Sequence, residues 1–89
     1  MSNLIIADTS CLIVLEKINR LTLLQELFTV VTLTPEVQSE YGNELPDWMG
    51  VIAVKDDSRR QILERELDKG EASAIALAVE NQDSLLLID

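Results

Sequence analysis

The sequence predicts an α/β domain built on a mainly parallel sheet of about four strands flanked by helices. Short apolar runs rich in leucine, isoleucine and valine alternate with segments in which apolar residues recur at helical spacing. Several helical segments begin with a capping residue and end near glycine or asparagine. No repeat or linker divides the 89 residues, so a single domain over residues 1–89 is expected, with right-handed crossovers between its strands.

The first expected strand is the apolar run of residues 4–7, which ends at Asp8. Its continuous apolar character is typical of a strand that is covered on both faces. Thr9 and Ser10 are expected to cap a helix that begins immediately afterwards. Asn19 and the arginine that follows it are expected to end that helix.

A capping box at residues 22–25 predicts a second, short helix. Residues 30–33 are expected to form the second strand. Thr34 is then placed to cap a helix in which Pro35 occupies the first position, where its missing N–H costs nothing. Gly42 is expected to end this helix.

Residues 51–54 form the expected third strand. A second capping box, at residues 58–61, predicts a helix that Gly70 ends. A further helix, rich in alanine, is expected to start at Glu71 and to pack closely on the sheet. Residues 85–88 form the expected fourth strand.

Composition and charge exclude several classes of protein. The single cysteine and the absence of histidine exclude a disulfide framework and the usual kinds of zinc site. The net charge of −9, with only seven lysines and arginines, argues against simple nucleic-acid binding, so contact with RNA would need bound cations or basic groups from elsewhere. No signal peptide or membrane-length apolar run is present, and a cytoplasmic protein is expected.

Four acidic residues are expected to converge on one pocket. Asp8 and Asp89 follow expected strands, and sites in open parallel sheets form beyond the carboxyl ends of the strands. Glu40 and Glu71 lie on the helices that follow the second strand and Gly70. Two carboxylates about 5 Å apart repel by about 3 kcal/mol at an effective dielectric of 20. A divalent cation would remove that repulsion, and oxygen ligands favour Mg²⁺ or Mn²⁺.

Each acid also has a plainer interpretation. Glu71 could serve only to complement the positive end of its helix dipole, as surface glutamates often do. Glu40 could be a solvated residue on the surface of its helix. Asp8 is harder to explain in this way, because it directly ends an apolar strand. Cys11 lies in an apolar stretch and is expected to be a core residue, not a nucleophile.

Four segments, in this order along the chain, resemble the acidic motifs of PIN domains, in particular those of VapC-type toxin ribonucleases. The segments span essentially the whole sequence, and each carries one of the four acids. They are residues 4–10, 34–40, 67–78 and 85–89.

The resemblance implies a metal-dependent endoribonuclease that hydrolyses RNA phosphodiesters with bound Mg²⁺ or Mn²⁺. The residues that would hold the metal and activate the attacking water are Asp8, Glu40, Glu71 and Asp89. Thr9 or Ser10 would contact the metal-bound water or a substrate phosphate. A glutamate at position 71 is typical of one branch of the family, where much of the wider family has aspartate.

The resemblance also implies partners: an RNA substrate, an antitoxin protein that covers the acidic pocket with a basic residue, and a second copy in a homodimer. PIN domains continue with a further strand and helices, so we expect this chain to be incomplete at its C-terminal end. An exposed strand edge would then favour dimers or higher oligomers. The alternative function is that of an inactive PIN relative that serves as an antitoxin-binding or oligomerisation module.

Two other α/β classes fit less well. A receiver domain would carry paired acids after the first strand, and a haloacid-dehalogenase-like phosphatase would carry Asp-x-Asp there. The triplet Asp8-Thr9-Ser10 satisfies neither pattern.

Overall fold

The computed structural model describes residues 4–88 and places four parallel strands in one sheet, in the order β3-β2-β1-β4. The expected α/β fold class with a parallel sheet is therefore confirmed. The elements are β1 (Leu4–Ala7), α1 (Thr9–Lys17), α2 (Thr22–Leu27), β2 (Val31–Leu33), α3 (Pro35–Tyr41), β3 (Met49–Val51), α4 (Asp57–Leu63), α5 (Lys69–Glu80) and β4 (Ser84–Leu87).

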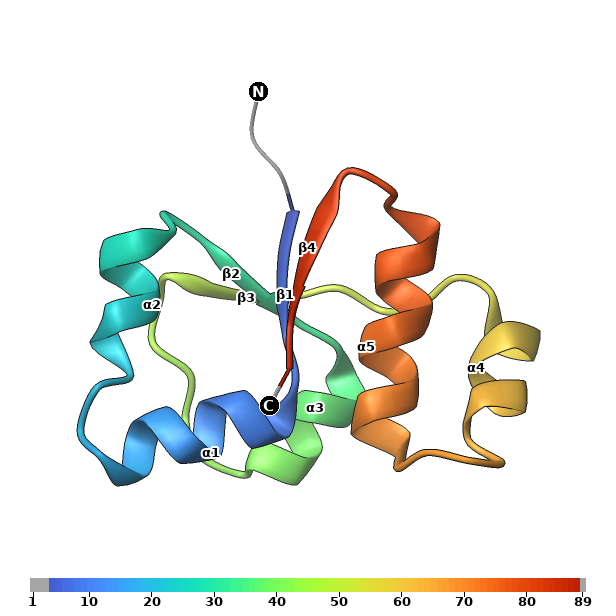
Figure 1. The fold of residues 1–89 in the computed structure, drawn as a ribbon, viewed down its shortest axis with the longest axis horizontal. Coiled ribbons are helices and arrows are strands. Elements are labelled where there is room, and N and C mark those ends of the chain that lie inside the picture. The colour runs from blue at the N-terminus through green and yellow to red at the C-terminus, as the bar shows by residue number, and fades with distance from the viewer. Residues whose placement is uncertain (1–3, 89) are drawn as a thin grey trace.

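The sheet lies between two helical layers. Figure 1 shows α1 and α2 on one side of the sheet and α5 on the other, with α4 packed outside α5. The third helix, α3, lies at the carboxyl end of the strands, between α1 and α5. Parallel strands need such crossover connections, and this arrangement brings the starts of α1, α3 and α5 to one edge of the sheet.

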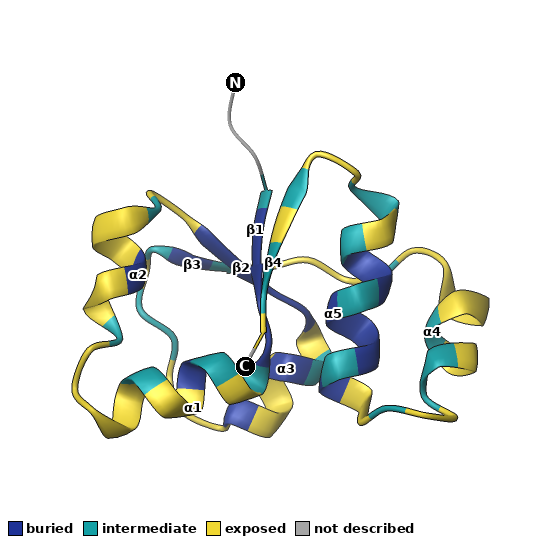
Figure 2. Ribbon diagram, in the orientation of Figure 1, coloured by how far each residue is buried: buried dark blue, intermediate teal, exposed yellow. Residues whose placement is uncertain are grey.

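The core is divided by the sheet into two clusters. The larger cluster packs the sheet against α1, α2 and α3 and includes Leu12, Leu33 and Val37. The smaller one packs Ile6 against Ala74 and Leu77 of α5. Figure 2 shows the same division, with buried positions concentrated on β1, β2 and the inner side of α5. The small residues of α5 allow its backbone to approach the sheet, as the sequence predicts.

The first helix is capped by Asp8, not by Thr9 or Ser10. The Asp8 carboxylate accepts a hydrogen bond from the Cys11 backbone N–H at 3.1 Å, and the Asp8 backbone is extended. The expectation that Thr9 and Ser10 cap the helix is therefore wrong, because the acid one position earlier is a better acceptor and has the required backbone conformation. Asn19, with a φ of 56°, ends the helix as expected.

Two other caps differ from the sequence prediction. Helix α2 begins after Leu21 without any side-chain cap, so the expected capping box at residues 22–25 does not form. Helix α4 is capped by Asp56, whose carboxylate accepts a hydrogen bond from Arg59 N–H, instead of by Ser58. The Thr34 cap and the left-handed Gly42 at the end of α3 are confirmed.

The third strand and the last helix begin earlier than expected. Strand β3 starts two residues before the predicted 51–54, because Val31 pairs with Met49 and fixes the register. Helix α5 starts at Lys69, so Gly70 lies in its first turn and does not end the preceding helix. None of the helices within residues 4–88 has the length and apolar character needed to cross a membrane.

Candidate active site

Asp8 lies at the carboxyl end of the central strand β1. Its residue surface is 3% exposed, and one carboxylate oxygen caps α1 through the Cys11 N–H. Its backbone N–H donates to the Leu87 carbonyl of β4 at 3.1 Å, so the neighbouring strand also holds it in place. Asp8 therefore presents a fixed negative charge at the edge of the sheet where sites form in open parallel folds.

Glu40 connects the three helix-bearing segments of the site. Its Oε1 accepts a hydrogen bond from the Thr9 hydroxyl at 2.8 Å, and its Oε2 accepts one from the Gly70 backbone N–H at 2.9 Å. The residue at the N-cap of α5, Asp68, makes no side-chain capping bond. Glu40 supplies that cap from thirty residues away, and its charge complements the positive end of the α5 dipole.

Gly70 is required by this contact. A Cβ at position 70 would lie 2.2 Å from Glu40 Oε1, which is closer than real side-chain contacts allow, and 3.0 Å from Thr9 Oγ1. Glycine is therefore the only residue that lets α5 begin against the Glu40 carboxylate with both hydrogen bonds intact. This glycine is needed because the Glu40 carboxylate approaches the backbone closely, and not because the backbone turns there.

The same contacts bring together the segments that carry three of the four predicted acids. Thr9 follows Asp8 in sequence, and Gly70 precedes Glu71, so the two partners of Glu40 are the immediate neighbours of two other acids. Glu71 lies half-buried in the first turn of α5. Figure 1 shows these helix starts gathered at the carboxyl end of β1.

The remaining predicted site residues have different positions. Asp89 lies outside the described residues, although β4 runs beside β1 and ends near Asp8, with Ala7 paired to Leu87. Ser10 is exposed at the start of α1. The Thr9 hydroxyl is directed to Glu40, so contact between Thr9 or Ser10 and a substrate phosphate stays a prediction.

Behind the acids lies a buried pair of hydroxyl groups. The Thr34 and Ser73 hydroxyl oxygens are 2.6 Å apart, and both residues have no exposed surface. Thr34 also accepts the Val37 N–H at the start of α3, and Ser73 donates to the Gly70 carbonyl. The pair thus connects the first turn of α3 to the first turn of α5.

The donor set suits a hard divalent cation, since it consists of carboxylate oxygens with hydroxyls nearby and contains no histidine. Over residues 4–88, however, no three acidic, cysteine or histidine side chains stand close enough together to hold a metal ion as they lie. The chemistry of the donors therefore fits a metal, although the described side chains do not form a ligand cluster as they lie.

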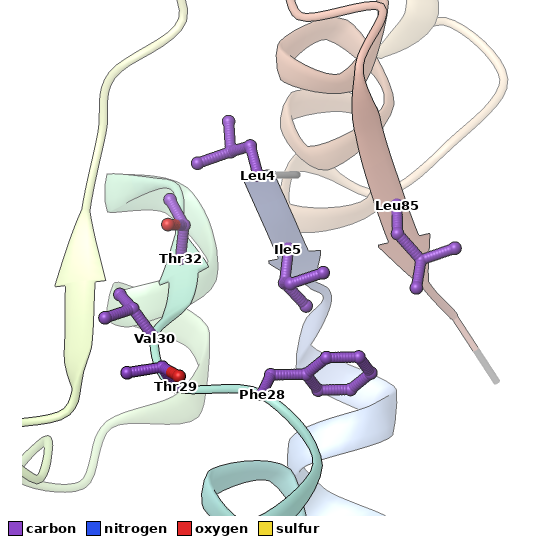
Figure 3. Close-up of a pocket in the computed structure, with 7 residues that line it drawn as sticks. All are labelled: Leu4, Ile5, Phe28, Thr29, Val30, Thr32 and Leu85. Atoms are coloured by element: carbon purple, nitrogen blue, oxygen red, sulfur yellow. The ribbon is translucent and has the colours of Figure 1, made fainter. Parts of the chain in front are cut away.

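A pocket at the opposite end of the strands has a different character. Figure 3 shows that it is lined by Leu4, Ile5, Phe28 and Leu85 with neighbouring threonine and valine residues, at the amino ends of β1 and β4. None of its lining residues is charged. It lacks the groups that phosphodiester chemistry needs, and the acidic edge remains the candidate site.

Three residues of the site were not found by reasoning from sequence. Of the three, only Gly70 has a sequence feature that could have indicated a place in the site, because it directly precedes a candidate acid. A glycine at that position is equally typical of the end of a helix. Thr34 is a good N-cap in any context, and Ser73 is one small residue among many. Their functions depend on contacts across 30 to 39 positions, which no local pattern contains.

The fold and the acidic edge define a class: an open parallel α/β domain with acidic residues on the segments that follow the strand ends. A family model described as the PIN domain matches residues 4–89, and the chain belongs to the PIN-domain family. PIN domains are generally nucleases and typically use divalent metal ions. Comparisons with curated proteins and with solved structures gave no match.

Proposed function

We propose that this chain acts as a metal-dependent endoribonuclease of the VapC toxin type and hydrolyses RNA phosphodiesters with Mg²⁺ or Mn²⁺. The observation that carries the proposal is the convergence of three acidic motifs through Glu40, which accepts hydrogen bonds from the neighbours of Asp8 and Glu71. Membership of a family of nucleases supports the same reaction class.

The four acids would hold the cation between them: Asp8, Glu40, Glu71 and Asp89. When bound, the cation lowers the pKa of a water molecule and neutralises charge on the phosphodiester. Asp8 contributes a carboxylate whose position is fixed by its N-cap bond and by β4. Glu71 contributes a second carboxylate from a helix whose start is anchored by Glu40.

The charge of the chain is consistent with this role. With a net charge of −9, the protein repels an RNA backbone unless cations or a basic partner intervene. A bound divalent ion would supply positive charge at the point where the phosphate must approach. The same acidity suits an antitoxin that inserts a basic side chain among these carboxylates, and we include such an antitoxin in the proposal.

A specific observation also favours the alternative, an inactive PIN relative that binds an antitoxin or its own kind. Both oxygens of Glu40 already accept hydrogen bonds from the protein, and no three potential ligands cluster within the described residues. In that case the acidic edge would bind a basic partner but would not organise a cation for catalysis.

A homodimer forms part of the proposal. In the sheet of the described residues, β3 and β4 are the edge strands. Each carries an exposed apolar side chain: Val51 on β3, and Leu85 on β4, which is 45% exposed. Unpaired strand edges with apolar side chains favour association. Light scattering at micromolar concentration tests this, and a monomer would contradict it.

The decisive experiment compares the parent with Asp8→Asn in Mn²⁺-dependent cleavage of a mixed single-stranded RNA. Asparagine keeps an oxygen that can accept the Cys11 N–H, so the cap of α1 survives while the negative charge is removed. We expect cleavage by the parent and a loss of at least about 100-fold in the variant, the scale at which electrostatic groups act in catalysis.

The other outcomes are equally informative. No cleavage by either protein would favour the inactive-module alternative. Equal cleavage by both would indicate a contaminating ribonuclease and would leave the proposed site without support. Omission of Mn²⁺ with added chelator serves as the second control, and cleavage that persists there would contradict metal dependence.

A further inference from the structure

We propose that Thr34 and Ser73 are positioning residues that hold Glu40 and Glu71 at a fixed separation through a directed chain of buried hydrogen bonds. The proposal rests on the proposed function for its importance to metal binding. Its structural part can be tested without any activity.

The direction of the chain follows from the number of hydroxyl hydrogens. The Ser73 hydroxyl has one hydrogen, and it is donated to the Gly70 carbonyl at 2.8 Å. The 2.6 Å contact with Thr34 must therefore use the Thr34 hydrogen, with Ser73 as the acceptor. Thr34 in turn accepts the Val37 N–H at 3.1 Å. Every hydrogen in the chain has one destination, so the order runs from Val37 through Thr34 and Ser73 to Gly70.

The two ends of this chain lie on the helices that carry the acids. Thr34 starts α3, the helix that carries Glu40, and Ser73 lies on α5 two positions after Glu71. The receiving residue, Gly70, also donates its N–H to Glu40. A closed loop of contacts therefore runs from α3 to α5 through the hydroxyls and back to α3 through Glu40.

A hydrogen-bonded chain sets a spacing more narrowly than apolar packing does. Hydroxyl hydrogen bonds occupy a range of only a few tenths of an ångström, whereas apolar side chains in contact can slide. Both hydroxyls are fully buried, so water cannot replace a missing partner without a rearrangement. The spacing between α3 and α5 decides whether Glu40 reaches Gly70, and hence how far Glu40 lies from Glu71.

The test uses Ser73→Ala and Thr34→Val, each of which removes the contact between the hydroxyls, and Thr34→Ser, which retains it. Ile6→Val is the matched control, because it removes one buried methyl group from the core beside α5 without touching the chain of hydrogen bonds. Comparison at equal measured stability separates a loss of positioning from a general loss of stability.

The first measurement is amide hydrogen exchange by NMR at Gly70. This amide lies in the first turn of α5, where no helical carbonyl can accept it, and Glu40 is its partner. We expect its exchange to become at least tenfold faster in Ser73→Ala and Thr34→Val, relative to the amides of β1. Thr34→Ser should stay within twofold of the parent, and Ile6→Val should change Gly70 and β1 together.

The second measurement is Mn²⁺ affinity, read from the electron paramagnetic resonance signal of the free ion, with Asp8→Asn to mark the site. We expect at least fivefold weaker binding in Ser73→Ala and in Thr34→Val, and recovery in Thr34→Ser. Cleavage at saturating Mn²⁺ should fall much less than affinity, because excess ion compensates for a poorly held ligand set.

Two results would overturn the proposal. Gly70 exchange that accelerates no more in Ser73→Ala than in Ile6→Val would show that the hydroxyls do not position Glu40. Faster Gly70 exchange with unchanged Mn²⁺ affinity would show that the positioning does not serve the metal. Absence of any Asp8-dependent Mn²⁺ binding in the parent would instead overturn the proposed function, and Gly70 exchange would still decide the structural claim by itself.

Discussion

Thr9 and Glu40 lie 31 positions apart in sequence and are joined by a hydrogen bond of 2.8 Å from the Thr9 hydroxyl to Glu40 Oε1. The contact joins the first residue of α1 to α3, the helix after the second strand. Thr9 therefore has a function that does not depend on substrate, which is to hold the Glu40 carboxylate. Removal of its hydroxyl is a direct test of the site.

Thr9→Val should reduce RNA cleavage by about tenfold, because valine has nearly the same shape but cannot donate to Glu40, and a hydrogen bond to a charged group contributes about 1.5 kcal/mol. Thr9→Ser keeps the donor and should behave like the parent. Initial rates at fixed Mn²⁺ measure this. Ser10→Ala is the control for substrate contact: a loss of cleavage there would show that the exposed Ser10 hydroxyl binds RNA.

Gly70→Ala should lower cleavage by more than tenfold with little change in stability. The added Cβ would meet Glu40 Oε1 at 2.2 Å, so the flexible Glu40 side chain must swing away and lose both of its hydrogen bonds. Alanine has a higher helix propensity than glycine, by up to about 1 kcal/mol, and this gain in stability offsets much of the loss of the two Glu40 hydrogen bonds.

Gly50→Ala provides the comparison for this variant. A Cβ at position 50 meets nothing within 4 Å, so cleavage and thermal stability should match those of the parent. Cleavage assays and thermal melts of the two alanine variants measure how far the loss of the Glu40 contact lowers activity and stability. Equal activity of both variants would contradict the assigned role of Gly70.

Asp56→Ala should destabilise the protein by about 1 kcal/mol, the usual cost of losing an N-cap side chain. Its carboxylate caps α4 through the Arg59 N–H. Ser58→Ala should leave stability unchanged within about 0.5 kcal/mol, because Ser58 does not cap this helix. Urea unfolding of the two variants distinguishes the caps, and the opposite ranking would support the cap expected from sequence.

Stability should fall at alkaline pH through Tyr41, the only tyrosine in the chain. Burial raises the pKa of Tyr41 above its ordinary value of 10.0, and the hydrogen bond to Glu16 at 2.5 Å adds to the effect. The folded state therefore holds the phenol proton more tightly than the unfolded state does. This contribution is complete below pH 10 and is lost as the pH rises through the folded pKa.

The Tyr41 titration can be followed by ultraviolet absorbance of the phenolate. We expect a folded-state midpoint above that of the denatured protein, and Tyr41→Phe should remove the corresponding fall in stability above pH 10. Because Tyr41 joins α3 to Glu16 on α1, the same variant should also loosen these two helices. A midpoint at or below 10.0 in the folded protein would contradict the prediction.

The sequence is sufficient to predict the parallel sheet and the place of Asp8 at the end of its first strand, because strands and their carboxyl ends follow from local apolar runs. It failed where a distant group replaced a local one. The sequence predicts the start of α5 at Glu71 instead of Lys69, because the cap comes from Glu40, which lies far away in sequence. The third strand was placed too late, because its register depends on pairing with Val31.

The caps show the same limit at short range. Thr9 and Ser10 are ordinary N-cap residues, but Asp8 precedes them and has the extended backbone that a cap needs. Its position at the end of a strand indicates a site residue, but Asp8 caps a helix as well. Sequence patterns assign one function to one residue, whereas this carboxylate can serve two, because the hydrogen bond that caps α1 uses one of its two oxygens.

The pairing of β1 with β4 also determines when the protein can fold during its synthesis. It joins Leu4 to Ser84 and extends over four residue pairs, so the central strand gains this neighbour only when the segment up to residue 87 is free to fold. Contacts that span most of a chain form late and slowly. On the ribosome, the Asp8 backbone would have no partner on this side until nearly all of the described chain had left the exit tunnel. The edge of the sheet at which Asp8 lies is therefore expected to be among the last parts of the described fold to form.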